Sequence, residues 1–422
     1  MDSVIFDATI LGNNYYKNNQ RSGIFQCTKE LFDTIYKNNM GKLSIYADIH
    51  SYEEVKLYFK KYYPALCIYT NGNKFSKLIQ KIECSLKMRK SKISNIFFRK
   101  INSLLIYIVS FIININKRIP CDLREILSTY NVFFSPMFAI PKFVRKYKLK
   151  NVLIIYDLIP LKMADYSGGI KGWFGAVYNS LNTSDYYFTI SEFTKTDFLD
   201  SCGSKIDKEK VYNTYIGVSD RFYPVEDKTL FEKIKNKYKI PSGKYLFSLC
   251  NIENRKNLKM QVTSFINFLM ETKVDDICYL MGGGVSSFHT LLNELKDLIP
   301  NELLNKIQYI GYIDDEDLPL LYSNALWFTF TSKFEGFGLP PLEAMKCGCP
   351  VVTSNRTSLP EICGDAAIIV DSDSKEEHVS AYKQMYFNET VRKFYIEKGF
   401  SQVKKFDWNK IVRHMYELFN LM

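Results

Sequence analysis

The sequence predicts an α/β protein with two doubly wound, Rossmann-like domains that face each other across a central cleft. The chain has 422 residues, and two domains are the usual expectation at that length. Hydrophobic residues make up 46% of it and aromatic residues 15%, enough apolar material for two cores. Short apolar runs alternate with segments of helical period in both halves, as in parallel sheets covered by helices on both faces.

The N-terminal half supplies the first set of alternating elements. It opens with "SVIFDATI", an apolar and β-branched run, and a loop rich in asparagine and a helical segment follow. Later apolar runs also end in polar residues. The expected strands are 3–10, 131–136, 151–157, 186–191 and 210–216, and the expected helices are 23–37 and 191–201.

The C-terminal half repeats this pattern. The expected strands are 244–250, 276–282, 306–312, 325–332, 349–354 and 366–371, and the expected helices are 257–271, 287–299 and 315–325. The join falls near residues 215–228, "YIGVSDRFYPVEDK", where a glycine, a proline and charges follow the last strand of the first half. We therefore expect one domain at 1–218 and a second at 219–400.

The net charge of +11 is concentrated in one part of the chain. Residues 1–218 carry 31 Lys/Arg and 18 Asp/Glu, whereas residues 219–422 carry 25 and 27. Within 56–150 there are 20 basic residues and three acidic ones. This asymmetry predicts that the N-terminal domain faces a polyanion or an anionic surface. Nucleic acid is not the expected partner, because the sequence has no helix-turn-helix, zinc or RNA-binding signature.

The basic stretch contains an apolar insert near 85–120. Its longest uncharged run, "INSLLIYIVSFIININ" at 101–116, follows the cationic segment "LKMRKSKISNIFFRK" at 86–100. Three alternatives are open: a buried helix of the N-terminal domain, a helix in a membrane interface, and a membrane span. The run is short for a span, which needs about 20 residues. The flanking cations favour peripheral contact with an anionic membrane.

The distribution of cysteines and the N-terminal sequence indicate the cellular compartment of the protein. The ten cysteines are scattered, which fits a reducing environment. Only Cys347 and Cys349 lie close together, and Gly348 between them suits a helix end better than a metal site. The opening "MDSVIFDATIL" lacks the basic start and long apolar core of a secretory signal. We expect a cytoplasmic protein, peripheral at the inner face of the membrane.

Two carboxylates frame a glycine-rich turn in "SKFEGFGLPPLEAMKCGCPVV", residues 332–352. Glu335 follows an expected strand, and Glu343 lies eight positions later in an expected helix. Ligands of open α/β sheets collect beyond the carboxyl ends of the strands. Gly336 and Gly338, which lack side chains, let a ligand approach the backbone closely. The segment therefore predicts a ligand site.

The start of the following helix predicts that the ligand carries a phosphate. Two prolines suit the first helical turn, so the N–H groups of Gly338 and Leu339 point out of a helix N-terminus. Glu335 and Glu343 then flank the phosphate and can accept hydrogen bonds from the hydroxyls of a sugar and of a ribose. A phosphate between a sugar and a ribose is the composition of a nucleotide sugar. In the alternative interpretation, Glu343 merely places a favourable negative charge in the first turn.

The segment "SKFEGFGLPPLEAMKCGCPVVTSNRTSLPEICGDAAIIVD", residues 332–371, resembles the donor-binding segment of family 4 glycosyltransferases. Their E-x7-E motif falls on Glu335 and Glu343. The resemblance extends to "RSGIFQCTKELF", "NVLIIYDLIPLK", "YLFSLCNIENRKNLKMQVTSF" and "FDWNKIVRHMYELF", and it is weakest at about 50–125. It implies the GT-B fold, in which residues 401–422 form a closing helix that returns to the N-terminal domain.

The resemblance also implies roles for the donor-binding residues. Glu335 meets hydroxyls of the transferred sugar and Glu343 meets the ribose. In the turn between them, the backbone N–H groups of Gly338 and Leu339 meet the diphosphate, and Gly336 and Phe337 are further substrate-binding residues.

Further residues are implied in transfer itself. Arg255 and Lys256 follow an expected strand and neutralise the charge that grows on the departing diphosphate. The alternative for this pair is a solvated loop. Gly23 lets the backbone of the N-terminal domain approach the diphosphate or the acceptor.

Tyr156 and Asp157 mark a departure from the family pattern. Many members carry His-Asp here, and tyrosine does not change charge near neutral pH as histidine can. Asp157 is a candidate to position or deprotonate the acceptor hydroxyl, and its alternative is a bond to the backbone of the following loop. Ser191 is more typical of a helix N-cap than of a ligand.

The resemblance implies a retaining hexosyltransferase of the mannosyltransferase-like branch that uses no metal or other cofactor. The "DSD" at 371–373 is interpreted as a surface turn. GDP-mannose is the first choice of donor, and a UDP-hexose or dTDP-rhamnose fits the same frame. The basic, apolar insert suggests a lipid-linked glycan acceptor in bacterial surface polysaccharide synthesis, such as O-antigen or capsule.

Other classes of function stay open as alternatives. One is an isomerase or phosphorylase on the same fold, and another is a non-catalytic scaffold that binds nucleotide sugars. A nicotinamide dehydrogenase is not expected, because "MGGGVSSF" lacks the G-x-G-x-x-G spacing.

Overall fold

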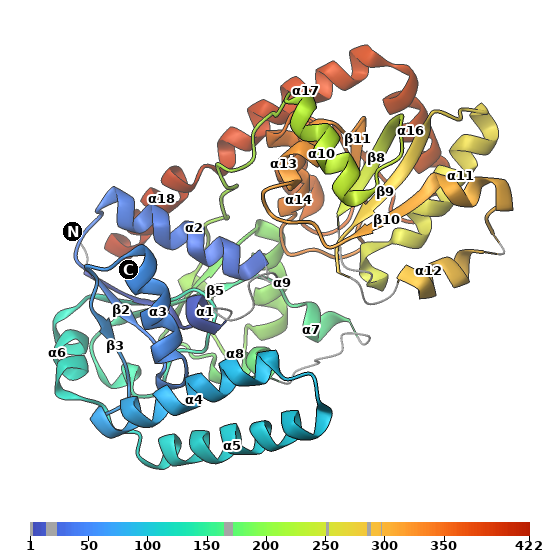
Figure 1. The fold of residues 1–422 in the computed structure, drawn as a ribbon. Helices are drawn as coiled ribbons and strands as arrows, with labels where there is room; N and C mark the ends of the chain where they lie inside the picture. The colour runs from blue at the N-terminus through green and yellow to red at the C-terminus, as the bar shows by residue number, and fades with distance from the viewer. Residues whose placement is uncertain (1–2, 14–22, 164–171, 250–252, 285–287, 297) are drawn as a thin grey trace.

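The computed structural model describes residues 3–13, 23–163, 172–249, 253–284, 288–296 and 298–422. Two α/β domains lie beside each other, and the last helices of the chain run from the second domain back along the first (Figure 1). The predicted architecture of two doubly wound domains is confirmed.

The first sheet contains seven parallel strands in the described part of the chain, in the order β3-β2-β1-β4-β5-β6-β7. The order reverses between β1 and β4, where Val4 pairs with both Leu43 and Val132. The strands are β1 (Val4–Asp7), β2 (Leu43–Tyr46), β3 (Ile68–Tyr69), β4 (Val132–Ser135), β5 (Lys150–Ile155), β6 (Tyr186–Thr189) and β7 (Val211–Asn213).

The strands of the first sheet that the sequence predicted are the strongly apolar ones. The residues of β1 and β4 are buried throughout, as expected for a parallel sheet covered on both faces. Sequence analysis did not predict β2 and β3, which have only four and two residues and carry little periodicity of their own.

Helices cover both faces of the first sheet and form an extension from it. They are α1 (Thr9–Asn13), α2 (Gly23–Asn38), α3 (Tyr52–Tyr62), α4 (Lys74–Lys92), α5 (Ile96–Ile115), α6 (Cys121–Thr129), α7 (Ile159–Lys162), α8 (Gly172–Ser180) and α9 (Glu192–Cys202). The interior face of α2 buries residues at helical spacing, including Phe25, Leu31 and Phe32.

The second sheet has six parallel strands among the described residues, in the order β10-β9-β8-β11-β12-β13. Its order reverses between β8 and β11. The strands are β8 (Lys244–Leu249), β9 (Ile277–Gly282), β10 (Ile307–Gly311), β11 (Trp327–Phe330), β12 (Val351–Ser354) and β13 (Ala367–Val370). The join predicted at 215–228 lies between the two sheets.

The helices around the second sheet complete the fold. They are α10 (Lys228–Tyr238), α11 (Leu258–Thr272), α12 (Phe288–Leu295), α13 (Leu318–Ser323), α14 (Leu339–Lys346), α15 (Leu359–Cys363), α16 (Lys375–Phe387), α17 (Glu389–Val403) and α18 (Trp408–Leu421). The closing helix begins later than the expected boundary at 401, because α17 continues to Val403 and a short turn follows.

The last helix, α18, packs into the core of the N-terminal domain. The Phe419 ring stacks on Phe188, with 5.7 Å between ring centroids, and meets the edge of Phe134 at 5.6 Å. The Lys150 ammonium donates to the Phe419 carbonyl oxygen at 2.6 Å. Residues near the C-terminus are therefore part of the first domain's structure.

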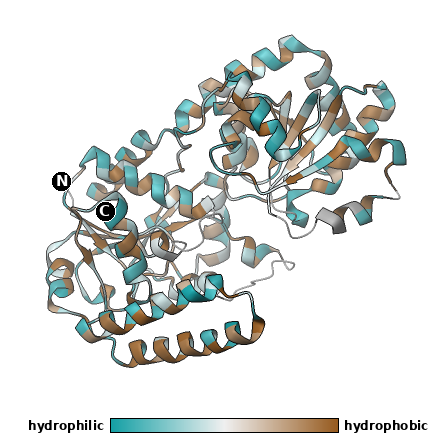
Figure 2. Cartoon of the chain, in the orientation of Figure 1, coloured by the Kyte–Doolittle hydropathy of each residue, from teal (hydrophilic) through white to brown (hydrophobic). Residues whose placement is uncertain are grey.

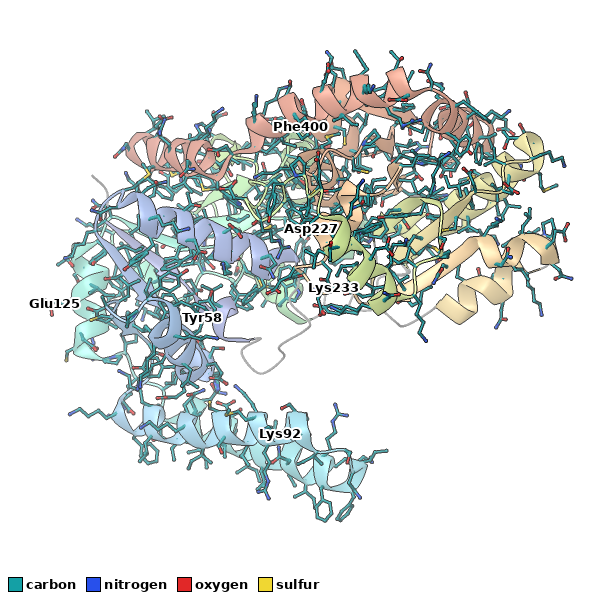
Figure 3. The ribbon with its side chains drawn as sticks, turned by 45° about the horizontal axis from the view of Figure 1, so that its top comes forward. Tyr58, Lys92, Glu125, Asp227, Lys233 and Phe400 are labelled. Atoms are coloured by element: carbon teal, nitrogen blue, oxygen red, sulfur yellow. The ribbon has the colours of Figure 1, made fainter. Side chains whose placement is uncertain are left out.

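The apolar insert forms a helical hairpin of α4 and α5 that extends from the N-terminal domain (Figure 3). Of the three alternatives left open for 101–116, the buried helix is wrong, because only Asn102 and Ile113 of α5 are buried. The helix is long and apolar enough to cross a bilayer, by length and composition alone, and 11% of its most apolar window is buried.

Candidate functional site

Three charged side chains meet at the carboxyl edge of the second sheet, where its strand order reverses. Arg255 and Lys256 follow β8, and Glu335 follows β11. The Glu335 carboxylate accepts from Arg255 Nη1 at 3.0 Å and from Lys256 Nζ at 2.6 Å. β8 and β11 are neighbours in the sheet, so their carboxyl ends bring the three side chains together. The alternative of a solvated loop pair is wrong for Arg255 and Lys256, whose side chains are 14% and 12% exposed.

The charges of this cluster hold Glu335 in its ionised form. Burial alone would raise the pKa of Glu335, but the cations of Lys256 and Arg255 outweigh it and lower that pKa. Arg255 is also held by Glu253, whose carboxylate lies 2.7 Å from Nε. The Lys256 ammonium lies 4.9 Å from the centre of the Phe330 ring. A carboxylate has about four acceptor positions, so Glu335 can still accept ligand hydroxyls.

The turn after Glu335 has the backbone shape that the sequence predicted. Gly338 caps α14 with φ of 122°, a conformation that favours glycine. The Ser358 hydroxyl donates to the carbonyls of Phe337 at 2.7 Å and Glu335 at 3.0 Å, which fixes the turn. The first turn of α14 includes two prolines, so the N–H groups of Gly338 and Leu339 are its main donors.

The Phe337 side chain does not take part in the ligand site. It is buried and meets the edge of the Phe406 ring, with 5.5 Å between centroids. A substrate contact of Phe337 is therefore restricted to its backbone.

Glu343 lies one turn inside α14 and faces the N-terminal domain. The Tyr322 hydroxyl donates to its carboxylate at 3.2 Å. Burial raises the pKa of Glu343 to about 7, although nearby Arg221 and the bond from Tyr322 oppose this. The pKa of the Cys27 thiol in α2 is raised to about 12, first by burial and second by the charge of Glu343. Glu343 therefore lies where the two domains meet.

Three further polar residues near Glu343 were not predicted from the sequence to be part of the site. Arg221 pairs with Asp315 at 3.1 Å between Nη1 and Oδ2. Gln26, in α2, donates to the same oxygen of Asp315 at 2.8 Å. Arg221 lies within the predicted join, and no local motif identifies it or its partners.

Asp157 approaches the charged cluster from the N-terminal domain. It follows β5, and its carboxylate accepts from the backbone N–H of Ile159 at 3.0 Å, the alternative role expected for it. Burial raises the pKa of Asp157, and the charge of Arg255 partly offsets this. Asp157 also lies close to the residue after Glu335, because a Cβ at Gly336 would be 2.8 Å from Cβ of Asp157. Asp157 can therefore bond the backbone and still lie beside the charged cluster.

Tyr156 and Gly23, two predicted substrate-binding residues, differ in their exposure: Tyr156 is buried and Gly23 is exposed. The Tyr156 side chain is buried, which raises its pKa, so its hydroxyl is not presented to solvent. Gly23 is the exposed first residue of α2, and a Cβ there would meet nothing within 4 Å. The loop before Gly23, at 14–22, lies outside the described residues.

The loop and helix after β6 form hydrogen bonds with the C-terminal domain. The hydroxyls of Ser191 and Thr194 donate to the Gly336 carbonyl at 2.7 and 2.9 Å. Ser191 also accepts from the Thr194 N–H, so the predicted N-cap is confirmed. Glu361, from the other domain, accepts from the N–H groups of Glu192 at 2.8 Å and Phe193 at 3.1 Å. The two domains are therefore closed on each other at this edge.

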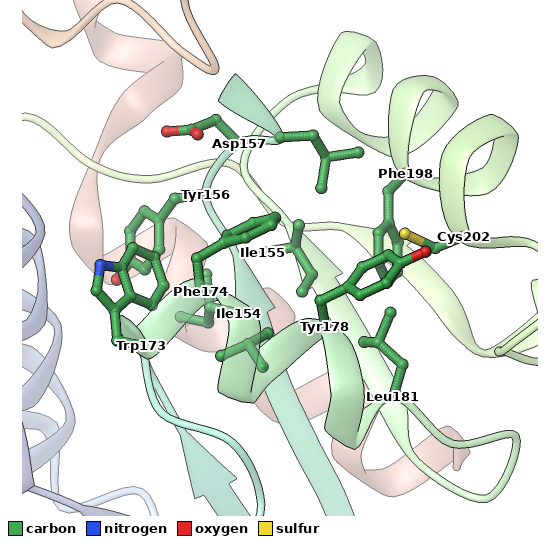
Figure 4. Close-up of a pocket in the computed structure, with 12 residues that line it drawn as sticks. Ile154, Ile155, Tyr156, Asp157, Trp173, Phe174, Tyr178, Leu181, Phe198 and Cys202 are labelled. Atoms are coloured by element: carbon green, nitrogen blue, oxygen red, sulfur yellow. The ribbon is translucent and has the colours of Figure 1, made fainter. Parts of the chain in front are cut away.

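A mainly apolar pocket lies in the N-terminal domain beside Asp157 (Figure 4). Aromatic side chains of α8, Trp173, Phe174 and Tyr178, line it together with residues of β5 and α9. Trp173 is 39% exposed, so part of this aromatic surface is open to a ligand. The sequence does not identify these residues as part of a site, because an aromatic helix is also typical of a core.

The chain is similar in sequence to known glycosyltransferases. Residues 231–402 match the family described as Glycosyl transferases group 1. O-antigen chain mannosyltransferase B of Escherichia coli is 29% identical over 247 residues, which cover 58% of this chain and 63% of that protein. Serotype-specific mannosyltransferase WbdA of Escherichia coli is 28% identical over 265 residues, covering 61% of this chain and 32% of WbdA. The chain thus spans less than two thirds of these relatives.

Solved structures match over nearly the whole chain. A glycosyltransferase from Rickettsia africae covers 99% of this chain and 98% of its own, with a TM-score of 0.63 and 18% identity. Anabaena HepE, solved with UDP and glucose, covers 100% of both chains with a TM-score of 0.65 and 13% identity. WaaG, a glycosyltransferase of lipopolysaccharide biosynthesis, has a TM-score of 0.60 at 12% identity. The predicted GT-B fold is confirmed.

Proposed function

We propose that the protein transfers a hexosyl unit from a nucleotide diphosphate sugar to a hydroxyl of a glycan, because residues 231–402 match the family described as Glycosyl transferases group 1. The observation that carries the proposal is the cluster of Glu335, Arg255 and Lys256 beside the N-terminus of α14. It combines a phosphate site with an ionised acceptor for sugar hydroxyls.

In the proposed complex, the donor diphosphate lies between the two cations and the start of α14. The N–H groups of Gly338 and Leu339 donate to its oxygens, and Arg255 and Lys256 stabilise the charge that develops as it leaves. Glu335 accepts from hydroxyls of the sugar, and Glu343 accepts from the ribose. The ion pairs of Glu335 restrict both cations before the donor arrives, so little reorganisation is needed.

The proposed transfer retains the configuration of the sugar by attack from the front face. The acceptor oxygen forms a bond to the anomeric carbon as the bond from that carbon to the diphosphate oxygen breaks. The acceptor proton passes to the departing diphosphate. Asp157 positions the acceptor hydroxyl, because it lies beside the cluster and at the edge of the aromatic pocket. The resemblance to family 4 glycosyltransferases supports retention.

We propose GDP-mannose as the donor. Two of the similar proteins are named as mannosyltransferases, and this supports mannose over other hexoses. The described residues around Glu343 carry no feature that selects guanine. A UDP-hexose or dTDP-rhamnose is therefore a specific alternative outcome of the test below.

We propose a lipid-linked glycan as the acceptor, within bacterial surface polysaccharide synthesis. One relative is named for the O-antigen chain, and another is named for a diphospho-undecaprenol acceptor at 27% identity. The exposed Trp173 beside Asp157 is suited to stack on the apolar face of a sugar ring. We also propose that the protein acts in the cytoplasm, peripheral at a membrane that presents such an acceptor.

The first test is a thermal-shift panel of GDP-, UDP- and dTDP-sugars on the full chain. A ligand that binds the native state raises the melting temperature once its concentration exceeds Kd. We expect one nucleotide class to shift the wild type and to lose its effect in Glu343→Ala. Glu397→Ala, which changes an exposed glutamate of α17, is the matched control and keeps the shift.

Turnover separates the proposed transfer from its alternatives. We expect release of nucleoside diphosphate only when a glycan acceptor is present. Conversion of the nucleotide sugar without acceptor would indicate an epimerase, and a requirement for free phosphate would indicate a phosphorylase. Binding without turnover under all these conditions would favour a scaffold and overturn the enzymatic proposal.

A further inference from the structure

The outer face of α5 is an unbroken apolar stripe that faces solvent. It consists of Phe97, Ile101, Leu104, Ile108, Phe111 and Ile115, which recur at intervals of three and four residues. These six side chains are 42% to 67% exposed. Figure 2 shows α5 as a mainly hydrophobic helix at the edge of the protein. A helix at a soluble surface normally presents polar residues there, so this orientation is inverted.

The opposite face of α5 carries the helix's polar anchors and points toward the protein. Asn102 donates to the Leu86 carbonyl oxygen at 2.7 Å, and the Ser110 hydroxyl donates to Glu83 at 2.7 Å. The Asn114 carboxamide oxygen lies 3.0 Å from Nε2 of His50. These hydrogen bonds fix the rotation of α5 about its own axis and therefore hold the apolar stripe outward.

The second helix of the hairpin is tied to the rest of the domain. Glu83 of α4 lies 3.2 Å from Nδ1 of His50, and Lys87 pairs with Glu54 of α3 at 3.3 Å. Gln80 donates to Glu54 at 2.8 Å. The hairpin base is closed where the side chains of Asn73 and Ser76 donate to the Asn116 carbonyl oxygen, each at 3.2 Å. The exposed stripe is therefore held at a fixed place on the domain.

The charge of the hairpin indicates what covers this stripe. Residues 74–118 contain eleven Lys/Arg and one acidic residue, Glu83, which is buried. Exposed cations of the hairpin have no ion-pair partner among the described residues: Arg89 and Lys92 in α4, Arg99 and Lys100 in α5, and Arg118 after α5. An apolar stripe bordered by cations complements the interface of an anionic bilayer. A second copy of the same hairpin would bring cations against cations.

We propose that the α4–α5 hairpin docks this protein on an anionic bilayer, with α5 lying in the plane of the interface and its stripe inserted among the acyl chains. α5 does not span the membrane, because its inner face is hydrogen-bonded to α4 and to the short 3-10 turn Ile49–Ser51, and α4 is strongly cationic. The inference stands on the hairpin itself, and it rests on the proposed function only in bringing the site to a lipid-linked acceptor.

The test uses the full chain and vesicles of phosphatidylcholine with or without phosphatidylglycerol. We expect the wild type to sediment with the anionic vesicles. A triple variant of the stripe, Phe97→Ser, Leu104→Ser and Phe111→Ser, should lose binding by about tenfold or more. The matched control changes two exposed phenylalanines and one exposed leucine of the C-terminal domain, Phe387→Ser, Phe394→Ser and Leu230→Ser, and should bind as the wild type does.

A second pair of variants isolates the charges. Arg99→Gln with Lys100→Gln should weaken binding to anionic vesicles about tenfold or more and reduce its salt dependence. Lys228→Gln with Lys233→Gln removes two exposed lysines from α10 and should leave binding unchanged. Circular dichroism and melting temperature confirm that each variant is folded before binding is compared.

Several results would overturn the proposal. One is a wild type that stays in the supernatant with every vesicle, and another is a stripe variant that binds as well as its control. A wild-type dimer that the stripe variant converts to monomers would assign the stripe to a second copy. Donor turnover on a water-soluble acceptor should be retained by the stripe variant. If turnover fails in every protein while binding persists, the proposed reaction is wrong and the docking surface stands.

Discussion

Gly336 of the C-terminal domain lies so close to Tyr156 of the N-terminal domain that a Cβ at position 336 would be 2.2 Å from the Tyr156 carbonyl oxygen. The same Cβ would be 2.8 Å from Cβ of Asp157. Both contacts involve groups that cannot rotate away. The absence of a side chain at 336 is therefore a requirement of domain closure, in addition to the close approach of a ligand that the sequence suggested.

Gly336→Ala should prevent the two domains from closing fully without unfolding either one. We expect the melting temperature to change little, because the added methyl group meets the other domain and not its own core. Transfer should fall about 100-fold, since a displacement near 1 Å at reacting groups has that effect. Steady-state turnover and small-angle scattering of the same sample measure both. Full activity in Gly336→Ala would show that the closed arrangement is not the reactive one.

Glu361→Ala should weaken the hydrogen-bonded contact that holds α9 against the second domain. The variant removes the acceptor for the N–H groups of Glu192 and Phe193, while the Ser191 cap inside α9 remains. We expect turnover to fall about tenfold or more, because a single hydrogen bond to a charged group is worth about that factor. Glu377→Ala is the control, because that carboxylate accepts one backbone N–H within its own domain. Equal losses in both variants would contradict a specific role in closure.

Glu335→Gln should destabilise the protein as well as abolish transfer. It leaves the cations of Arg255 and Lys256 side by side, and we expect a loss of about 2 kcal/mol in the free energy of unfolding at neutral pH, below the 3–5 typical of fully buried pairs. Chemical denaturation measures this. Asp365→Asn, which breaks an exposed pair with Lys398, should cause no measurable change.

The pH dependence of stability should also differ in Glu335→Gln. The folded pKa of Glu335 is lowered, so its stabilisation is present above the ordinary glutamate pKa and is lost as the pH falls through the folded value. The wild type should therefore lose more stability than the variant in acid. Parallel acid-unfolding curves would mean that Glu335 is not the ionised partner of the two cations.

Glu343 should make donor binding pH-dependent near neutrality. Its pKa is raised to about 7, and ribose hydroxyls donate better to the ionised form, so Kd should rise about tenfold per pH unit below that value. Calorimetric titration with the nucleoside diphosphate at several pH values measures this. In Glu343→Gln the dependence should disappear. A wild-type Kd that does not vary between about pH 5.5 and 8 would contradict the ribose contact.

The same group should reduce stability as the pH rises. A carboxyl whose folded pKa is raised favours the native state while it is protonated, and this advantage is lost between the ordinary glutamate pKa and about 7. Glu343→Gln should therefore be more stable than the wild type above neutrality and similar to it in mild acid. Denaturation at both pH values is the measurement.

The charged cluster could be predicted from the sequence because its geometry is local to one sheet. The runs that became β8 and β11 were visible, and the carboxyl ends of neighbouring parallel strands share an edge. Glu335, Arg255 and Lys256 each follow such an end directly. Their meeting then requires that β8 and β11 be neighbours in the sheet, which only the structure shows.

The contacts between the domains could not be predicted in this way. Ser191 and Gly336 are 145 positions apart, and Gln26 and Asp315 are 289 apart. Their pairing depends on how one rigid domain sits against the other, which no local periodicity records. The hairpin left three alternatives open for a similar reason. Apolar spacing shows that α5 has an apolar face, but only the hydrogen bonds of Asn102 and Ser110 show that the face points outward.

The packing of α18 on the N-terminal domain means that the chain passes between the domains twice. The two passages lie together: the Val218 N–H donates to the Phe406 carbonyl oxygen at 2.9 Å, and the absent Cβ of Gly217 leaves room for the Trp408 ring. Two adjacent connections between two domains act as a hinge. We therefore expect rotation about the axis through both connections to be the easiest relative motion of the domains, and this motion would open or close the space between the Glu335 cluster and the N-terminal domain.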